Sequence, residues 1–195
     1  FSKSFDIVYN LAVFANLNQS NKDPLRTMDL NVIGNLKIID RCLKNNIKRY
    51  IYASSAYAMS EKGSFYGISK LASEKIIEQY EKNFSLPFSI IRYGSVYSER
   101  DFDNNYIYTL IKEAILNQEI VHSGDGEEVR EYIHAADAAK LSVDILESED
   151  YKNKHIILTG SQRVKRIELF NMINEILGQK INVKLKNKSV KGHYK

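Results

Sequence analysis

The chain has 195 residues, of which 44% are hydrophobic, and this suits one large domain or one and a half small ones. A formal net charge of +4 gives no compositional support for nucleic-acid binding, and we interpret the lysine-rich stretch 184–195 as a solvated tail. No apolar run reaches membrane-spanning length and no signal peptide is visible, so we expect no membrane partner. The single cysteine, Cys42, cannot form an internal disulfide and falls on an apolar helical stripe, which indicates a buried structural thiol in a cytoplasmic protein.

Hydrophobic patterning predicts alternating strands and helices in the first half of the chain. Three segments are short and apolar, as in strands buried on both faces: 6–12 (DIVYNLA), 49–53 (RYIYA) and 88–93 (FSIIRY). Asp23 followed by Pro24 predicts the start of a helix that continues to residue 43. A second helix is predicted over 65–82, with Ser64 as its cap. Its expected buried side is Ile68, Leu71, Ala72, Ile76, Ile77 and Tyr80.

The second half of the chain changes character. Helices are predicted at 105–118, 135–147 and 167–177, and short strands at 119–122, 129–133, 154–158 and 180–185. The order of elements predicts an α/β fold with a doubly wound parallel sheet, because parallel strands need long crossovers. We assign residues 1–97 to this sheet domain and 98–195 mainly to a smaller α+β substrate-binding subdomain, with 135–147 and 154–158 returning to the sheet layer.

Tyr66 and Lys70 follow a strand that ends in Ser54 and Ser55. Residues four apart share a helix face, so the Lys70 ammonium is expected near the Tyr66 phenol, where a positive charge favours phenolate and lowers a pKa that is ordinarily about 10. Such a tyrosine is suited to general acid–base catalysis, with Ser55 binding the same substrate oxygen. The alternative for Ser55 is a strand-end hydroxyl that satisfies local backbone groups.

The Tyr-x-x-x-Lys pattern is weak evidence when it stands alone. The chain contains a second match, Tyr108 and Lys112, which falls in the middle of a predicted helix with no serine-bearing strand end just upstream. Ligands of open α/β sheets bind beyond the carboxyl ends of the strands, and Tyr66 begins the helix that follows such an end. We therefore expect Tyr66, and not Tyr108, to be functional.

Six stretches resemble the extended short-chain dehydrogenase/reductase family, in particular its nucleotide-sugar epimerases and dehydratases: DIVYNLA, NVIGN, RYIYASSAY, SFYGISKLASE, SIIRYGSVY and GDGEEVREYIHAADAA. They span most of the chain in the family's order. The resemblance implies a Rossmann-like fold, an NAD cofactor with NADP not excluded, a nucleotide-sugar substrate and a homodimer. It implies catalytic roles for Ser55, Tyr66 and Lys70.

The resemblance also assigns binding residues. Those implied to bind the cofactor are Asn10, Leu11, Ala12, Asn31, Tyr66, Lys70, Tyr93 and Gly94. Those implied to bind substrate are Ser55, Ser95 and Arg130. Arg130 is implied to bind the diphosphate through its planar guanidinium. Asn31 has the alternative of bonding neighbouring backbone, and Arg130 that of an ion pair with Glu127 or Glu131. No metal site is expected.

The sequence departs from the family in two informative ways. It has no glycine-rich phosphate loop: Gly124 and Gly126 imitate one, but Val129 stands at the third glycine position and a strand-like run follows. The family's first strands would precede Phe1, so we expect a fragment that lacks the N-terminal half of the cofactor domain.

The second departure concerns the reaction. Family dehydratases carry Asp-Glu where this chain has Ala56 and Tyr57, which favours epimerisation through a transient keto-sugar. A nucleotide-sugar reductase or dehydratase is the alternative within the family. An inactive or truncated relative that acts as a binding module is the alternative of another class.

Overall fold

The computed structural model of the protein describes residues 5–100, 105–178 and 180–186. The chain divides into two compact units. The first consists of Phe1–Tyr93 and Leu141–Leu158, and the second of Gly94–Lys140 and Thr159–Lys195.

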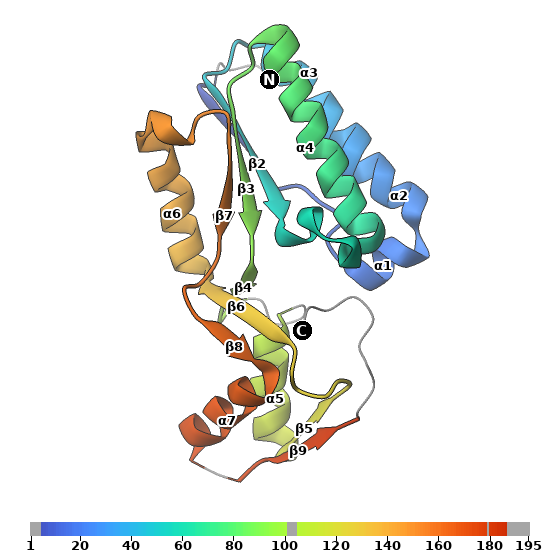
Figure 1. Ribbon diagram of the computed structural model, residues 1–195, viewed down its shortest axis with the longest axis vertical. Helices are drawn as coiled ribbons and strands as arrows, with labels where there is room; N and C mark the ends of the chain where they lie inside the picture. The colour runs from blue at the N-terminus through green and yellow to red at the C-terminus, as the bar shows by residue number, and fades with distance from the viewer. Residues whose placement is uncertain (1–4, 101–104, 179, 187–195) are drawn as a thin grey trace. The chain divides into compact units, whose positions relative to one another are not determined.

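The first unit contains a four-stranded parallel sheet with the strand order β1-β2-β3-β7 (Figure 1). The strands are β1 (Ile7–Asn10), β2 (Arg49–Ser55), β3 (Phe88–Tyr93) and β7 (Lys154–Leu158). All four predicted strands are confirmed, although β1 ends before residue 12 and β2 continues to Ser55. Because the strands are parallel, their carboxyl ends meet at one edge, where Ser55 pairs in register with Tyr93.

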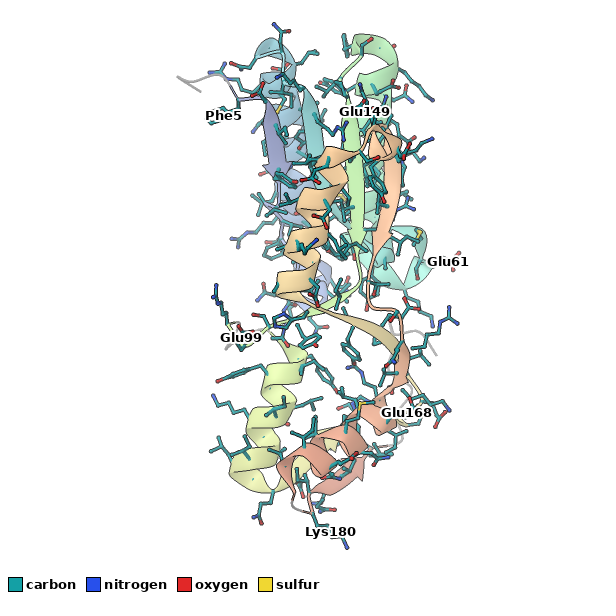
Figure 2. All side chains as sticks on the ribbon, turned by 90° about the vertical axis from the view of Figure 1, so that its left-hand side faces the viewer. Phe5, Glu61, Glu99, Glu149, Glu168 and Lys180 are labelled. Atoms are coloured by element: carbon teal, nitrogen blue, oxygen red, sulfur yellow. The ribbon has the colours of Figure 1, made fainter. Side chains whose placement is uncertain are left out.

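Helices cover both faces of this sheet, so the predicted doubly wound arrangement is confirmed (Figures 1 and 2). One face carries α1 (Leu17–Lys22), α2 (Pro24–Met28), a π-helical turn (Asp29–Ile33), α3 (Gly34–Lys44) and α4 (Ser64–Phe84). The other face carries the later part of α6 (Ala135–Glu147), where Ser142 O accepts a hydrogen bond of 2.7 Å from Tyr9 Oη. The predicted helix start at Asp23 is confirmed, because its side chain accepts from Arg26 N and Pro24 occupies the first turn.

The core of the first unit lies between the sheet and helices α3 and α4. Its buried members are Ile39, Cys42, Ile47, Tyr50, Tyr52, Ile77, Leu86, Phe88 and Ile90. Cys42 is 1% exposed, as predicted for a structural thiol, and burial raises its pKa to about 11. A thiol in that state is a poor nucleophile, which suits a packing role.

The second unit is built from shorter elements around a separate core. One sheet has the order β4-β6-β8 and a second pair is β5-β9. The bounds are β4 (Ser95–Tyr97), β5 (Glu119–His122), β6 (Val129–His134), β8 (Arg163–Lys165), β9 (Asn182–Leu185), α5 (Tyr106–Asn117) and α7 (Arg166–Leu177). Leu110, Ala114, Ile120, Phe170, Ile173 and Ile181 form its core. The strand β6 follows the turn at Gly124–Gly126, so the rejection of a phosphate loop there is confirmed.

Across the described parts of the chain, no helix combines the length and apolarity that a membrane crossing requires.

Candidate active site

The connection from β2 to α4 brings the candidate catalytic residues together. Two short 3₁₀ helices, Ala56–Met59 and Glu61–Gly63, carry the chain from the end of β2 to the start of α4. Ser64 was predicted to cap α4, and this is wrong. The cap position is Gly63, which makes no side-chain capping bond, and α4 begins at Ser64. The φ angle of Ser64 is 47°, outside the usual helical range. Tyr66 therefore lies in the first turn of α4, immediately after the compact connection.

Gly67 allows α4 to pack closely on this connection. A Cβ atom at Gly67 would lie 2.7 Å from the backbone oxygen of Tyr57, whereas a Cβ at Gly34 in α3 would lie 3.6 Å from its nearest neighbour, Asp29 O. The backbone of Tyr57 cannot yield as a flexible side chain would, so only glycine fits beside Tyr66 without a shift.

We expect Gly67→Ala to lower the free energy of unfolding by about 1–3 kcal/mol, because an overpacked contact outweighs the higher helix propensity of alanine. Gly34→Ala is the matched control in an open helical position and is expected to raise it by about 0.5–1 kcal/mol. Urea unfolding of both variants measures the difference. Equal effects would show that the contact with Tyr57 is not constraining.

The Tyr66 side chain is half-buried, with its phenol near Ser55. Burial raises the pKa of the phenol, the Ser55 hydrogen bond lowers it, and Tyr57 raises it further, so the net direction is upward. The Tyr57 and Tyr66 rings meet edge-on with centroids 6.4 Å apart. The predicted lowering of this pKa by Lys70 is wrong for the chain as it stands, because removal from water is the largest effect.

Ser55 makes the local backbone bond of its second predicted alternative. Its hydroxyl accepts a hydrogen bond of 3.2 Å from Tyr57 N. A hydroxyl has one donor and two acceptor positions, so this bond leaves others for a ligand. Ser55 thus orders the start of the connection while it faces the candidate acid–base group.

Lys70 is buried, with its ammonium at the end of β2. Its Nζ donates a hydrogen bond of 2.6 Å to Ala53 O and lies 4.7 Å from the Tyr52 ring centroid and 5.9 Å from that of Tyr66. Burial lowers the pKa of Lys70 to about 8, and the neighbouring Glu74 carboxylate raises it. Lys70 therefore lies near Tyr66, as predicted, but its ammonium donates to the backbone carbonyl of Ala53.

Asn31 connects the loop after β1 to α4. Its Oδ1 accepts from Phe14 N at 2.7 Å, and its Nδ2 donates to Ser69 Oγ at 2.9 Å. Ser69 Oγ in turn donates to Tyr66 O at 2.8 Å. Asn31 lies in the π-helical turn, a geometry that often marks functional sites, and its described bonds match the alternative in which it holds neighbouring backbone.

At the end of β1 a buried residue, Asn10, is followed by two exposed residues, Leu11 and Ala12. Asn10 is 5% exposed and donates to Asn35 Oδ1 at 2.9 Å and Tyr50 Oη at 2.8 Å, while its Oδ1 accepts from Ala12 N at 3.1 Å. Leu11 is 61% exposed, and Ala12 is exposed as well. The Asn10 side chain thus shapes the end of β1 through its own bonds, leaving the following backbone accessible.

Tyr93 lies at the same sheet edge, but its side chain is turned to the other face. Its phenol makes a hydrogen bond of 2.6 Å with Ser142 Oγ on α6, across the sheet from α4. The predicted cofactor contact of Tyr93 would therefore have to use its backbone.

The remaining predicted residues belong to the second unit. Gly94 packs on Thr159, whose Oγ1 leaves no room for a Cβ atom, and Ser95 begins β4 and pairs with Tyr132. Arg130, in β6, donates from Nη1 to Val129 O at 2.7 Å. Its alternative ion-pair partners are engaged elsewhere as well: Glu127 pairs with Lys165, and Glu131 with Arg163.

Within the described ranges, no three or more His, Cys, Asp or Glu side chains are grouped to hold a metal ion.

Comparisons with known proteins place this chain in a family. The model of the NAD dependent epimerase/dehydratase family matches residues 1–160. The chain is similar to the solved structure of UDP-glucuronic acid 4-epimerase from Bacillus cereus in complex with UDP-glucuronic acid and NAD, with a TM-score of 0.89 and 25% identity, covering 97% of this chain and 65% of that one. For UDP-N-acetylglucosamine 4-epimerase from Methanobrevibacter ruminantium M1 the TM-score is 0.86 at 25% identity, covering 95% and 65%.

A curated relative, UDP-glucose 4-epimerase of Lacticaseibacillus casei, is 23% identical over 210 residues, covering 92% of this chain and 63% of that protein. The chain thus spans just under two thirds of the length of the proteins that it matches. Because the family model covers most of its residues, the chain belongs to the NAD-dependent epimerase/dehydratase family.

Proposed function

We propose that the protein is an NAD-dependent nucleotide-sugar 4-epimerase in which Tyr66 is the acid–base residue. The observation that carries the proposal is the half-buried Tyr66 phenol near Ser55, with the Lys70 ammonium on the same stripe of α4, 5.9 Å from the Tyr66 ring centroid. This arrangement lies at the carboxyl edge of a parallel sheet, where α/β folds bind ligands.

The residues present fit the ribose and nicotinamide end of the cofactor. Lys70 is 2% exposed and makes its hydrogen bond to Ala53 O, so among the described residues it retains two of the three donors of an ammonium. Sugar hydroxyls are suitable acceptors for such donors. Lys70, Tyr66 and the exposed backbone after Asn10 would hold NAD, which supplies a hydride acceptor and donor for the sugar carbon.

The protein's own groups handle the proton. Ser55 Oγ holds the C4 oxygen of the sugar, and Tyr66 Oη takes the hydroxyl proton and later returns it to the same oxygen. Burial keeps the phenol protonated at neutral pH in the chain alone, which is the form that returns the proton. The base form needs compensating positive charge, and Lys70 supplies a cation on the same helix face.

The residues after Ser55 favour epimerisation over dehydration. Ala56 and Tyr57 carry no carboxylate, so this segment offers no second acid–base pair for removing water. The three relatives described above are 4-epimerases named for three different UDP-sugars, which supports the reaction and leaves the sugar open.

The test is incubation of the native protein with UDP-glucose, UDP-glucuronic acid and UDP-N-acetylglucosamine in turn, with product analysis by proton NMR. We expect interconversion of the C4 epimers with no net change in NAD or NADH. Stoichiometric oxidation of NADH by an added nucleotide 4-keto-sugar, without epimerisation of the three UDP-sugars, would indicate a reductase, and ligand binding without turnover would indicate a binding module.

Arg130 provides a test of the substrate side. We expect Arg130→Ala to raise KM about tenfold or more, which corresponds to about 1.4 kcal/mol of lost binding, because a guanidinium binds diphosphate oxygens in pairs. The matched control is Arg163→Ala on the neighbouring strand β8, whose side chain is 81% exposed. A KM for Arg130→Ala within about twofold of the control would rule out the phosphate role.

A further inference from the structure

One stripe of α4 meets the end of β2 at three successive positions. Tyr66 lies near Ser55, Lys70 Nζ donates to Ala53 O at 2.6 Å, and Glu74 Oε1 accepts from Ser54 Oγ at 2.5 Å. The three helix residues are spaced by four, so they lie one above the other on a single face. The first two are the candidate catalytic pair, whereas Glu74 has no part in the proton transfer proposed above.

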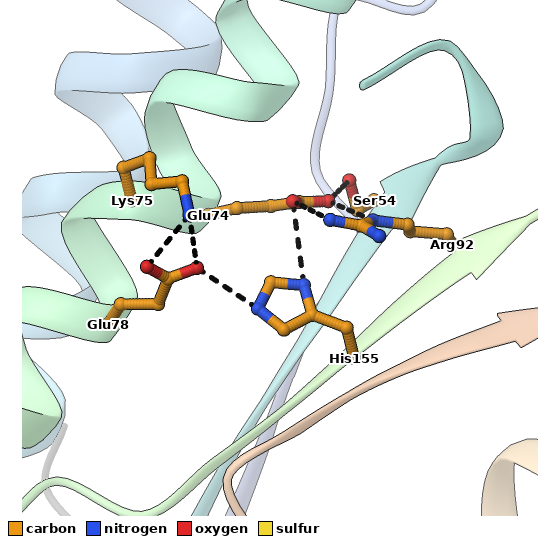
Figure 3. Close-up of polar contacts among 6 residues, drawn as sticks. All are labelled: Ser54, Glu74, Lys75, Glu78, Arg92 and His155. Carbon is orange, nitrogen blue, oxygen red and sulfur yellow. Dashed lines mark hydrogen bonds and ion pairs between the residues drawn. The ribbon is translucent and has the colours of Figure 1, made fainter. Parts of the chain in front are cut away.

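Glu74 is 0% exposed and is the centre of a network of charged groups (Figure 3). Arg92 Nε donates to Glu74 Oε1 at 2.9 Å, and Arg92 Nη2 donates to Oε2 at 2.6 Å. His155 Nδ1 lies 3.5 Å from Glu74 Oε2, and His155 Nε2 lies 3.1 Å from Glu78 Oε1. Through these contacts one carboxylate joins α4 to strands β2, β3 and β7.

The register of the sheet places these contacts next to the candidate site. Ser54 precedes Ser55 in β2, and it pairs with Arg92, the residue before Tyr93 in β3. Ser54 and Arg92, two of the partners of Glu74, thus each lie one residue before the end of their strand, at the edge where we expect the ligand to bind. If α4 slid along the sheet, the buried carboxylate would lose its partners, and an uncompensated buried charge is strongly destabilising.

We propose that Glu74 is a positioning residue that fixes α4 on the end of β2, so that Tyr66 and Ser55 bind the same substrate oxygen. The inference rests on the proposed function for the roles of Tyr66 and Ser55. Glu74 is two turns from Tyr66, about 12 Å along the helix at 1.5 Å per residue, so it acts through the helix and not by touching the substrate.

Glu74→Gln is the direct test. Glutamine has the shape of glutamate but cannot form the bidentate, charged pair of hydrogen bonds with Arg92. In the native protein we expect kcat to fall about 10-fold to 100-fold with KM within about threefold, because a small displacement of positioned groups is costly. Glu78→Gln is the matched control: Glu78 is one turn further along α4 and contacts His155 and Lys75, without hydrogen bonds to Ser54 or Arg92. It is expected to keep kcat within about twofold.

A second readout does not depend on turnover. NMR of this chain labelled with ¹³C at tyrosine Cζ and lysine Cε reports directly on Tyr66 and Lys70. Glu74→Gln is expected to shift the Tyr66 resonance and to lower the pKa of Lys70 below about 8, since the Glu74 carboxylate now raises it. Glu78→Gln is expected to leave the Tyr66 resonance unchanged.

If Glu74→Gln does not fold, the double variant Glu74→Leu/Arg92→Met decides the matter, because replacing a buried ion pair by apolar groups of similar volume is often neutral or stabilising. A folded variant of either kind with wild-type kcat and an unshifted Tyr66 resonance overturns the proposal. Failure of the proposed function is separate: the wild type would then show no epimerisation, and the resonances would still report whether Glu74 positions Tyr66.

Discussion

Tyr66→Phe is expected to lower kcat of the native protein by about 10²–10⁴-fold, the usual contribution of a general acid–base group. The substitution removes only the phenolic oxygen near Ser55 and leaves the ring that meets Tyr57 edge-on. We therefore expect the fold to persist and nucleotide-sugar affinity to stay within a few fold of the wild type. Steady-state kinetics with the sugar identified by product analysis, together with calorimetric binding, measures both quantities.

The second Tyr-x-x-x-Lys match in the chain supplies a matched control. Tyr108 lies on α5 in the second unit, away from any serine-bearing strand end in sequence. Tyr108→Phe is expected to keep kcat near the wild-type value. Unchanged turnover in Tyr66→Phe would remove Tyr66 from the mechanism, whatever the result at Tyr108.

Lys70→Met is expected to change how stability depends on pH. Burial lowers the pKa of Lys70 from 10.5 to about 8, so between these values the unfolded chain binds a proton that the folded chain has lost. In this window the Lys70 contribution to stability therefore rises with pH. Below about pH 8 the folded state bears the full cost of the buried ammonium, about 3 kcal/mol at about 1.4 kcal/mol per unit of pKa.

Methionine keeps an unbranched apolar side chain and removes the titrating group. The difference in unfolding free energy between wild type and Lys70→Met should therefore move by about 3 kcal/mol in favour of wild type from pH 7 to pH 10.5. Urea unfolding at several pH values measures it, and taking the difference cancels buried groups such as Cys42 that both proteins share. Lys37→Met, at an exposed position on α3, is the control. A difference for Lys70→Met that is as flat as that control would contradict the lowered pKa.

The sheet was predictable from the sequence because its strands are continuous apolar runs. Segments 49–53, 88–93 and 154–158 lie between helices, and only parallel pairing accommodates such long crossovers. Strands β4 and β8 were missed because three residues are too few to show a period.

Patterning was right for one part of helix α4, where Ile77 is buried and Ile76 and Tyr80 pack against the core, and wrong for another. Ile68 and Leu71 were expected to be buried and are 56% and 40% exposed, whereas Ser73 and Glu74 are fully buried. The periodicity argument assumes that a helix buries its apolar side. Here the polar side is buried, because Asn31, Ser54 and Arg92 supply it with hydrogen bonds.

The grouping of Ser55, Tyr66 and Lys70 was predictable from the sequence, but the electrostatics of these residues were not. The spacing of Ser55, Tyr66 and Lys70 was sufficient to bring them together, but the pKa of Tyr66 depends on how much water the fold removes, which no sequence spacing records. Glu74 was missed, although the continuation of the four-residue spacing from Tyr66 through Lys70 was visible in the sequence.

The path of the chain between its two units bears on how the protein is synthesised. Strand β7 pairs with β3, yet its residues leave the ribosome only after Gly94–Lys140 has been made. Until then β3 has an unpaired edge, and such edges are prone to pairing with other chains. Since the chain returns to the first unit at Leu141 and leaves it again after Leu158, no single cut between residues 93 and 158 releases either unit intact. Truncations meant to isolate the candidate catalytic residues would therefore remove the strand that closes this edge.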